Sequence, residues 1–349
     1  MPHNGEADLP HVSVIVAFRG ESEATFRRSA EALRALHYPH DRLQVIWVVD
    51  RGDEIALERA RAAAGAMSAP EWKVVEAIRP RAEALNAGLA ASSGEVFALF
   101  DADAVPEPSQ LRKAVDALRS GRWQAVESPQ FVDRGARPWL TALIRAEAAC
   151  WFASMQSMDW FTGTHMLAGS SIYFTRQTYE QVGSFFGPLS EEPIDWSLRF
   201  ANLGLQAGVL DSISLDIPIR NAWSGLLQRR RWIKGQTECL MRRTKSLSAG
   251  RALLLAVAVL ASNFAVLLVL PVLLLSAFSA VAFKLLLALV ALEALRIGVT
   301  ALTCGDFHRH VPTRGWFLLL PWELASTIGY WLGVLDWCTG RQVWDQARS

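Results

Sequence analysis

The most constraining feature of the sequence is a long uncharged stretch near its carboxyl end. No acidic or basic residue occurs from Ala252 to Phe283. A helix of ~20 residues crosses the apolar layer of a membrane, so this stretch is long enough for one complete membrane helix and the start of a second. The second helix is expected to reach Leu302, with a tight turn at residues 276–280. A membrane region is therefore predicted at residues 251–349.

Charged residues near this region predict its orientation. Eight basic residues and one acidic residue lie within 229–251. Because basic residues concentrate on the cytosolic side, the amino-terminal part and the 303–315 loop are predicted to be cytosolic. The chain is expected to be a multi-pass protein of a bacterial inner membrane. A third segment at 316–337 either spans or re-enters the membrane, since Pro321 and Glu323 interrupt it.

Two opposite charges lie inside the second predicted membrane helix. Glu293 and Arg296 are three residues apart and can pair on one face. Ionisable residues within a membrane usually face the protein interior. The pair is therefore expected to be structural or to line the path of the acceptor.

The first 126 residues alternate between apolar runs and helical patterns. This alternation predicts right-handed crossovers and a mostly parallel, doubly wound α/β sheet. A near-neutral net charge of +1 argues against a nucleic-acid partner, and four cysteines without a C-x-x-C pair predict neither a disulfide framework nor a zinc site. The expected strands lie at residues 12–16, 43–49, 72–77, 96–100 and 123–126.

Carboxylates follow two of these strands. Asp101 and Asp103 come directly after the strand at 96–100, at a spacing that puts strand side chains on one side. Open α/β sheets bind ligands at this edge, and two close carboxylates suit a hard cation, Mg²⁺ or Mn²⁺, that also holds phosphate. The alternative is an acidic turn. Asp50 ends another strand on the same edge, where it could instead cap a helix.

Four motifs occur in order along this half. In sequence they are Val14-Ile15-Val16 with Gly20-Glu21, Asp50-Arg51-Gly52-Asp53, Arg81-x-x-Ala84-Leu85-Asn86-x-Gly88 and Asp101-Ala102-Asp103. Together they resemble the nucleotide-sugar-binding half of family-2 inverting glycosyltransferases, with a glycosyltransferase-A-like fold. The resemblance implies that Asp50 holds the nucleoside, Asp101 the ribose and phosphate side, and Asp103 the metal. Arg81 replaces the usual Lys and keeps a positive charge suited to phosphate.

Residues 127–250 are expected to form the acceptor side. A helix with several aromatic residues at 138–161 suits a membrane interface or an ordinary core. The segment 127–131 resembles the Pro-Gln segment of cellulose-synthase-like enzymes. The small-residue loop, Leu167-Ala168-Gly169-Ser170-Ser171, resembles the loop that family members place under the acceptor. The resemblance implies that Gly169 and Ser170 bind the acceptor.

The segment 190–199 carries the candidate general base. Family members show Thr-Glu-Asp followed by x-Asp-Leu-Ser-x-Arg, and the Asp of the first motif is their base. Aligned on Asp195 without a gap, the base position falls on Pro193, and with one inserted residue Glu192 takes it. A base must reach the acceptor hydroxyl, so either Glu192 or Asp195 is expected to serve.

The run Gln228-Arg229-Arg230-Arg231-Trp232 resembles the Q-x-x-R-W motif of membrane-bound synthases of cellulose and hyaluronan and of ceramide glucosyltransferases. On a helix, Gln228 and Arg231 share a face. The resemblance implies that these two residues bind the donor and that Trp232 stacks on an acceptor sugar. The alternative is a basic helix that only anchors the chain at a membrane surface.

Together these features predict a membrane-bound inverting glycosyltransferase. It is expected to move a sugar from a nucleotide sugar, a UDP-sugar, to a hydroxyl of a membrane-associated acceptor, with a divalent metal as cofactor. A glycolipid or short glycan is favoured as acceptor over a growing polysaccharide, because few membrane helices follow the catalytic part. An alternative of another class is an inactive membrane module that only binds nucleotide sugars.

Overall fold

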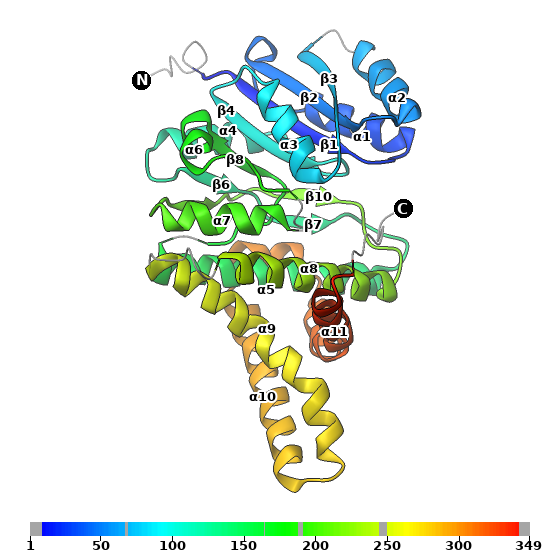
Figure 1. Cartoon of the computed structure of the whole chain (residues 1–349), viewed down its shortest axis with the longest axis vertical. Helices are drawn as coiled ribbons and strands as arrows, with labels where there is room; N and C mark the ends of the chain where they lie inside the picture. Colours follow the sequence, from blue (N-terminus) through cyan, green and yellow to red (C-terminus); the bar gives the residue numbers. More distant parts are fainter. Residues whose placement is uncertain (1–8, 67–68, 164, 188–190, 244–249, 342–349) are drawn as a thin grey trace. The chain divides into compact units, whose positions relative to one another are not determined.

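The computed structural model describes residues 9–66, 69–163, 165–187, 191–243 and 250–341 (Figure 1). Its contacts divide the chain into two compact units. The first unit contains the chain up to Gln130 and the segment Met166–Asp216. The second contains Phe131–His165 and the chain from Ile217 onward.

Within the described residues, the first unit is built on a seven-stranded sheet with the order β3-β2-β1-β4-β8-β6-β9. The first four of these strands are parallel neighbours, and β9 is parallel to β6. β8 lies between β4 and β6 and is antiparallel to both. The predicted mostly parallel sheet is therefore confirmed. The strands are β1 (Val12–Phe18), β2 (Leu43–Asp50), β3 (Glu71–Ala77), β4 (Val96–Asp101), β6 (Ala125–Glu127), β8 (Ile172–Thr175) and β9 (Ala207–Val209).

Helices and loops bury both faces of this sheet. Successive side chains of a strand point to opposite faces, and in β1 Val14 and Val16 join one apolar core while Ile15 joins the other. All three are fully buried, which is typical of a parallel strand covered on both sides. The helices are α1 (Glu23–Arg34), η1 (His40–Arg42), α2 (Glu54–Gly65), α3 (Arg81–Ala90), α4 (Gln110–Arg119), α6 (Arg176–Val182) and α7 (Glu192–Asn202).

Three short strands lie outside this sheet. β5 (Val105–Pro106) pairs with β10 (Ser214–Asp216) in antiparallel orientation. β7 (Gln130–Val132) begins where the chain leaves the first unit.

The second unit is helical. α9 and α10 form a hairpin, and α5 and α8 run across the direction of that hairpin (Figure 1). α11 packs against α8 and α5. The block 127–250, expected to form one acceptor-side half, is shared between both units, because α5 and α8 pack with the carboxyl-terminal helices. The helices are α5 (Pro138–Thr162), α8 (Ala222–Arg243), α9 (Gly250–Ser276), α10 (Ala280–Thr303), η2 (Gly305–His310) and α11 (Thr313–Thr339).

Among the described residues, α10 and α11 are long and apolar enough to cross a membrane. The turn between α9 and α10 lies between Ser276 and Ala280, where the sequence predicts it. Side chains at 255–265 of α9 lie outside the described residues, and its described apolar section is Val266–Ser276. α11 continues through Pro321 without a break. How many of these helices cross a membrane stays a prediction.

Candidate active site

Two of the predicted donor-side aspartates end strands that flank β1. Phe18 of β1 is paired with Val49, the residue before Asp50, and Ala17 is paired with Asp101. Since these strands are parallel, Asp50 and Asp101 lie on the same rim of the sheet. This is the rim at which ligands bind in open α/β sheets.

Asp50 lines a pocket of about 630 Å³ in the described part of the chain. Its carboxylate accepts a hydrogen bond of 2.7 Å from Arg79 Nε, and Ile55 and Ile78 line the same pocket. The alternative that Asp50 caps the next helix is wrong, because Asp53 is the N-cap of α2 and accepts a backbone hydrogen bond of 3.0 Å there. Most residues that line this pocket are charged, namely Asp50, Arg51, Asp53, Glu54 and Arg79, so the pocket suits a polar ligand.

Arg81, the first residue of α3, connects three parts of the first unit. Its Nη2 donates to Asp101 Oδ1 at 2.7 Å and to the Gly169 carbonyl at 3.0 Å, and its Nη1 donates to Glu192 Oε1. Burial opposes the charge on Arg81, but the Glu192 and Asp101 carboxylates outweigh it and raise the pKa of the guanidinium. The guanidinium therefore stays charged and joins the strand end, the small-residue loop and α7.

The small-residue loop contacts both the end of β4 at Asp101 and the start of α7. Gly169 has φ +99°, and a Cβ there would lie 2.7 Å from Pro193 Cγ, so the loop passes directly against the start of α7. Ser170 is 1% exposed, and its Oγ accepts a hydrogen bond of 2.9 Å from the Asp101 N–H. In this geometry the Ser170 hydroxyl supports the end of β4. Contact of Gly169 or Ser170 with an acceptor stays a prediction.

Glu192 and Asp195 have different surroundings although both lie in the first turn of α7. Glu192 is 2% exposed and pairs with Arg81. Asp195 is fully buried and accepts a hydrogen bond of 3.1 Å from Arg199 Nε one turn later. The N-cap residue of α7 is Glu191, so Asp195 lies inside the helix. Ser190, at the start of the predicted segment, lies outside the described residues.

Glu21 is a carboxylate of this rim to which the sequence pattern assigned no role. It follows β1, and it accepts a hydrogen bond from the Arg19 backbone N–H. Burial raises the pKa of Glu21 to about 7, against the effect of backbone hydrogen bonds and with help from the charges of Asp103 and Asp101. The signal that could have found it is its place in the first of the four motifs, three residues after the end of β1.

The described residues contain no group of three or more His, Cys, Asp or Glu side chains placed to hold a metal ion, and two carboxylates of this rim are the candidate ligands. Asp103, in the turn after β4, is 9% exposed, and its charge reaches Glu21 together with that of Asp101. Carboxylate oxygens are the ligands that Mg²⁺ and Mn²⁺ prefer, and one of these carboxylates, Asp101, also pairs with Arg81 at 2.7 Å. Asp101 and Asp103 are thus the residues that would hold such an ion.

The candidate residues of the second unit lie on α8. Gln228 is 8% exposed, while Arg231 and Trp232 are half-buried. The ring of Trp232 lies 5.5 Å from the guanidinium of Arg229, its neighbour on the same helix. The roles of Gln228, Arg231 and Trp232 in binding donor and acceptor stay predictions.

The model of the family described as Glycosyl transferase family group 2 matches residues 96–295. The chain belongs to this family. The match covers β4 with Asp101 and Asp103, the loop at Gly169, α7 with Glu192, and α8. The resemblance drawn from the motifs is therefore confirmed at the level of the family, and the Q-x-x-R-W type stays a prediction.

Curated relatives match about two thirds of this chain. It is 26% identical over 235 residues to the probable glycosyltransferase YdaM of Bacillus subtilis (strain 168), covering 65% of this chain and 56% of that protein. It is 27% identical over 233 residues to the beta-monoglucosyldiacylglycerol synthase of Synechocystis sp. (strain ATCC 27184 / PCC 6803 / Kazusa), covering 65% of this chain and 48% of that protein. The glycosyltransferase spans about half the length of the curated relatives that it matches.

A solved structure shares the fold of this glycosyltransferase. The mannosyltransferase PcManGT from Pyrobaculum calidifontis, in complex with GDP-Man and Mn²⁺, superposes with a TM-score of 0.59 at 20% identity. The superposition covers 96% of this chain and 88% of that chain. At this identity the likeness supports the fold alone.

Proposed function

We propose that this protein is a membrane-bound inverting glycosyltransferase. It transfers a sugar from a UDP-sugar to a hydroxyl of a membrane-associated acceptor, a glycolipid or a short glycan. The observation that carries the proposal is the bridge from Arg81 to both Asp101 and Glu192. A carboxylate that is held beside the donor-side rim has the position that a general base needs.

In the proposed reaction Glu192 is the general base. Its carboxylate takes the proton of the acceptor hydroxyl as the acceptor oxygen forms a bond to the anomeric carbon. The bond from that carbon to the diphosphate breaks on the opposite side, which inverts the anomeric configuration. Arg81 lies beside this rim and offsets the negative charge that grows on the leaving diphosphate, which is the main electrostatic contribution expected in such a site.

Asp101 and Asp103 are the proposed ligands of a divalent metal. When bound, Mg²⁺ or Mn²⁺ would neutralise charge on the diphosphate. The structure of PcManGT supports this, because that neighbour holds Mn²⁺ together with the nucleotide sugar GDP-Man. Asp50 and its pocket are proposed to take the nucleoside.

The proposed membrane association is based on the second unit, and the proposed acceptor is based on the relatives. α10 is apolar, and exposed large side chains along it include Phe283, Leu292 and Leu302. A relative named a beta-monoglucosyldiacylglycerol synthase favours a lipid acceptor. A processive polysaccharide synthase is the alternative within this class. An inactive nucleotide-sugar-binding membrane module is the alternative outside it.

The deciding experiment is transfer from radiolabelled donors in membranes that contain the protein. A panel of UDP-sugars with GDP-mannose is offered together with extracted lipids, and products are identified by mass spectrometry. A labelled glycolipid formed with inversion supports the proposal. A long polymer supports the synthase alternative, and donor binding without any product supports the inactive module.

A further inference from the structure

Three consecutive arginines on α8 have different surroundings. Successive residues of a helix point in directions ~100° apart, so Arg229, Arg230 and Arg231 leave α8 on three sides. The sequence resemblance assigns a role to Arg231 alone. The contacts of the other two lie within the second unit.

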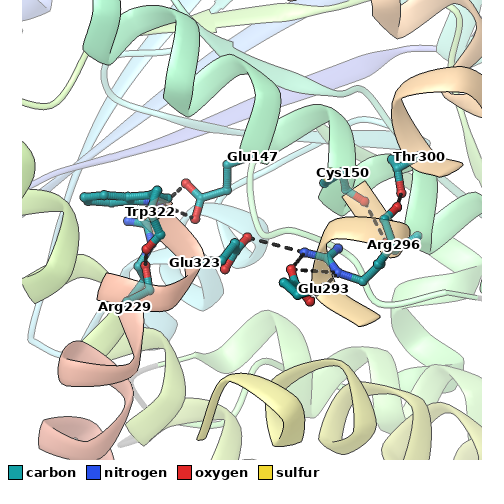
Figure 2. Close-up of polar contacts among 10 residues, drawn as sticks. Glu147, Cys150, Arg229, Glu293, Arg296, Thr300, Trp322 and Glu323 are labelled. Carbon is teal, nitrogen blue, oxygen red and sulfur yellow. Dashed lines mark hydrogen bonds and ion pairs between the residues drawn. The ribbon is translucent and has the colours of Figure 1, made fainter. Parts of the chain in front are cut away.

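Arg229 is the most deeply buried of the three, with 1% of its surface exposed. It forms an ion pair with Glu147 of α5, and its guanidinium lies 4.5 Å from the ring centroid of Trp322 on α11. Trp322 Nε1 donates to the same Glu147 at 3.4 Å. Figure 2 shows Glu147 directed at both partners, so this side of α8 is held by α5 and α11 together.

Arg230 is held on another side of the helix. Its Nε donates to Asp336 Oδ2 at 2.5 Å, and its Nη2 donates to Asp336 Oδ1 at 3.0 Å. Both side chains are mostly buried, at 14% and 6% exposed. A guanidinium that binds both oxygens of one carboxylate fixes direction as well as distance, so this fork restrains the rotation of α8 about its axis.

Glycines on α11 bring the two helix backbones into direct contact. A Cβ at Gly329 would lie 2.5 Å from the Leu226 carbonyl oxygen, and one at Gly333 would lie 2.5 Å from the Arg230 carbonyl oxygen. The glycines are one turn apart, which is the small-xxx-small spacing of closely packed helices. α11 therefore packs directly against α8, between the contacts that α11 makes with Arg229 and with Arg230.

α11 also contacts α10, the second helix of the α9–α10 hairpin. Glu323 of α11 lies 3.5 Å from Arg296 of α10, and Arg296 Nε donates to both carboxylate oxygens of Glu293 at 3.0 Å (Figure 2). The predicted pairing of Glu293 with Arg296 is thereby confirmed. Ion pairs therefore connect α10 to α11, and α11 contacts the arginines of α8 through Trp322 and Asp336.

We propose that Arg229 and Arg230 are positioning residues that set the rotation of α8 through Glu147 and Asp336. In this arrangement the two arginines hold the helix, and the side of α8 that carries Gln228, Arg231 and Trp232 is presented in one orientation. The inference rests on the proposed function for the roles of these three residues, but the orientation itself is measurable without activity.

The first test separates positioning from stability. Arg230→Met with Asp336→Leu removes the whole fork and leaves no buried unpaired charge, so stability should be close to wild type. We expect kcat to fall about a hundredfold, as a displacement of ~1 Å at a reacting group can cause. Arg230→Lys keeps the charge but loses the fork, and it should show the same selective loss. The matched control, Asp116→Asn, breaks an exposed Arg112–Asp116 pair and should leave kcat unchanged.

The second test does not need turnover. A cysteine replaces Trp232 in a Cys338→Ser background, because Cys338 is the exposed native cysteine of the described chain. The rate of maleimide labelling reports the orientation of α8, and it should change when the fork is removed. A folded Arg230→Lys or double variant with wild-type kcat and an unchanged labelling rate would overturn the inference. If the wild type itself shows no transfer, the proposed function fails, and the labelling rate alone decides the inference.

Discussion

Arg81 and Glu192, 111 residues apart in sequence, are hydrogen-bonded to each other, and the same guanidinium holds Asp101 at 2.7 Å. The contact distinguishes the two carboxylates that the sequence offers as the general base. Glu192 belongs to the rim with the D-x-D motif, whereas Asp195 pairs with Arg199 within its own helix.

We expect Glu192→Gln to abolish transfer with little effect on donor affinity. Gln keeps the shape and can still accept a hydrogen bond from Arg81, but it cannot take a proton, and a positioned base contributes about 10²–10⁴-fold. Transfer is measured with labelled donor, and affinity by calorimetry. Asp195→Asn is the comparison, and it should lower the free energy of unfolding by about 1–3 kcal/mol through its buried contact with Arg199. An inactive but well-folded Asp195→Asn beside an active Glu192→Gln would reverse the two roles.

Asp103→Asn should leave the protein folded and remove activity, because it deletes the charge of one proposed metal ligand. EDTA should inhibit the wild type, and added Mg²⁺ or Mn²⁺ should restore it. Activity is followed across a metal titration, with circular dichroism as the folding control. Full activity in chelator would show that the D-x-D carboxylates do not act through a metal.

Gly169→Ala should both destabilise the first unit and slow transfer. The new methyl would lie 2.7 Å from Pro193 Cγ at a backbone with φ +99°, and overpacking of this kind costs about 1–3 kcal/mol. The new methyl group would also displace the first turn of α7, which carries Glu192. Gly65→Ala is the matched control, because a Cβ there meets no atom within 4 Å. Equal stability and activity for both variants would mean that the loop adapts freely.

The raised pKa of Glu21 should make the free energy of unfolding depend on pH. Its pKa is about 7 in the folded protein, above its ordinary value of 4.5. Between these two values the folded state keeps a proton that the unfolded chain has released, so stability should fall as pH rises through this window. Glu21→Gln should remove this part of the slope. The unfolding midpoint of both proteins is recorded against pH in EDTA, and identical slopes would contradict the burial of Glu21.

The turn between α9 and α10 should face the side of the membrane opposite the first unit's expected cytosolic location. A cysteine at Ser279, in a Cys338→Ser background, should react with an impermeant maleimide added to intact cells. A cysteine at Thr313, within the 303–315 segment, should react only after lysis. The reverse pattern would invert the predicted topology.

Local patterns of the sequence determined which segments become strands and helices. Val96–Asp101 forms a strand because its apolar run is buried on both faces, and the turn at Ser276–Ala280 lies where two apolar helices must reverse. Asp50 and Asp101 could be placed on one rim for the same reason, since the carboxyl ends of parallel strands meet there. Such features depend on side-chain period and hydrophobicity, which are local properties.

Contacts between distant segments were decided only by the tertiary structure. No local pattern indicates that β8 inserts between β4 and β6, or that Glu192 rather than Asp195 reaches Arg81. Glu21 acquires its raised pKa from burial beside Asp103 and Asp101, which lie some 80 residues later in the chain. Three adjacent arginines on α8 have the same chemistry in sequence, and the helix packed against each side decides what each one does. The physical reason is that the energy of a charged group depends on its partners and its burial, and both are set by packing rather than by neighbours in the chain.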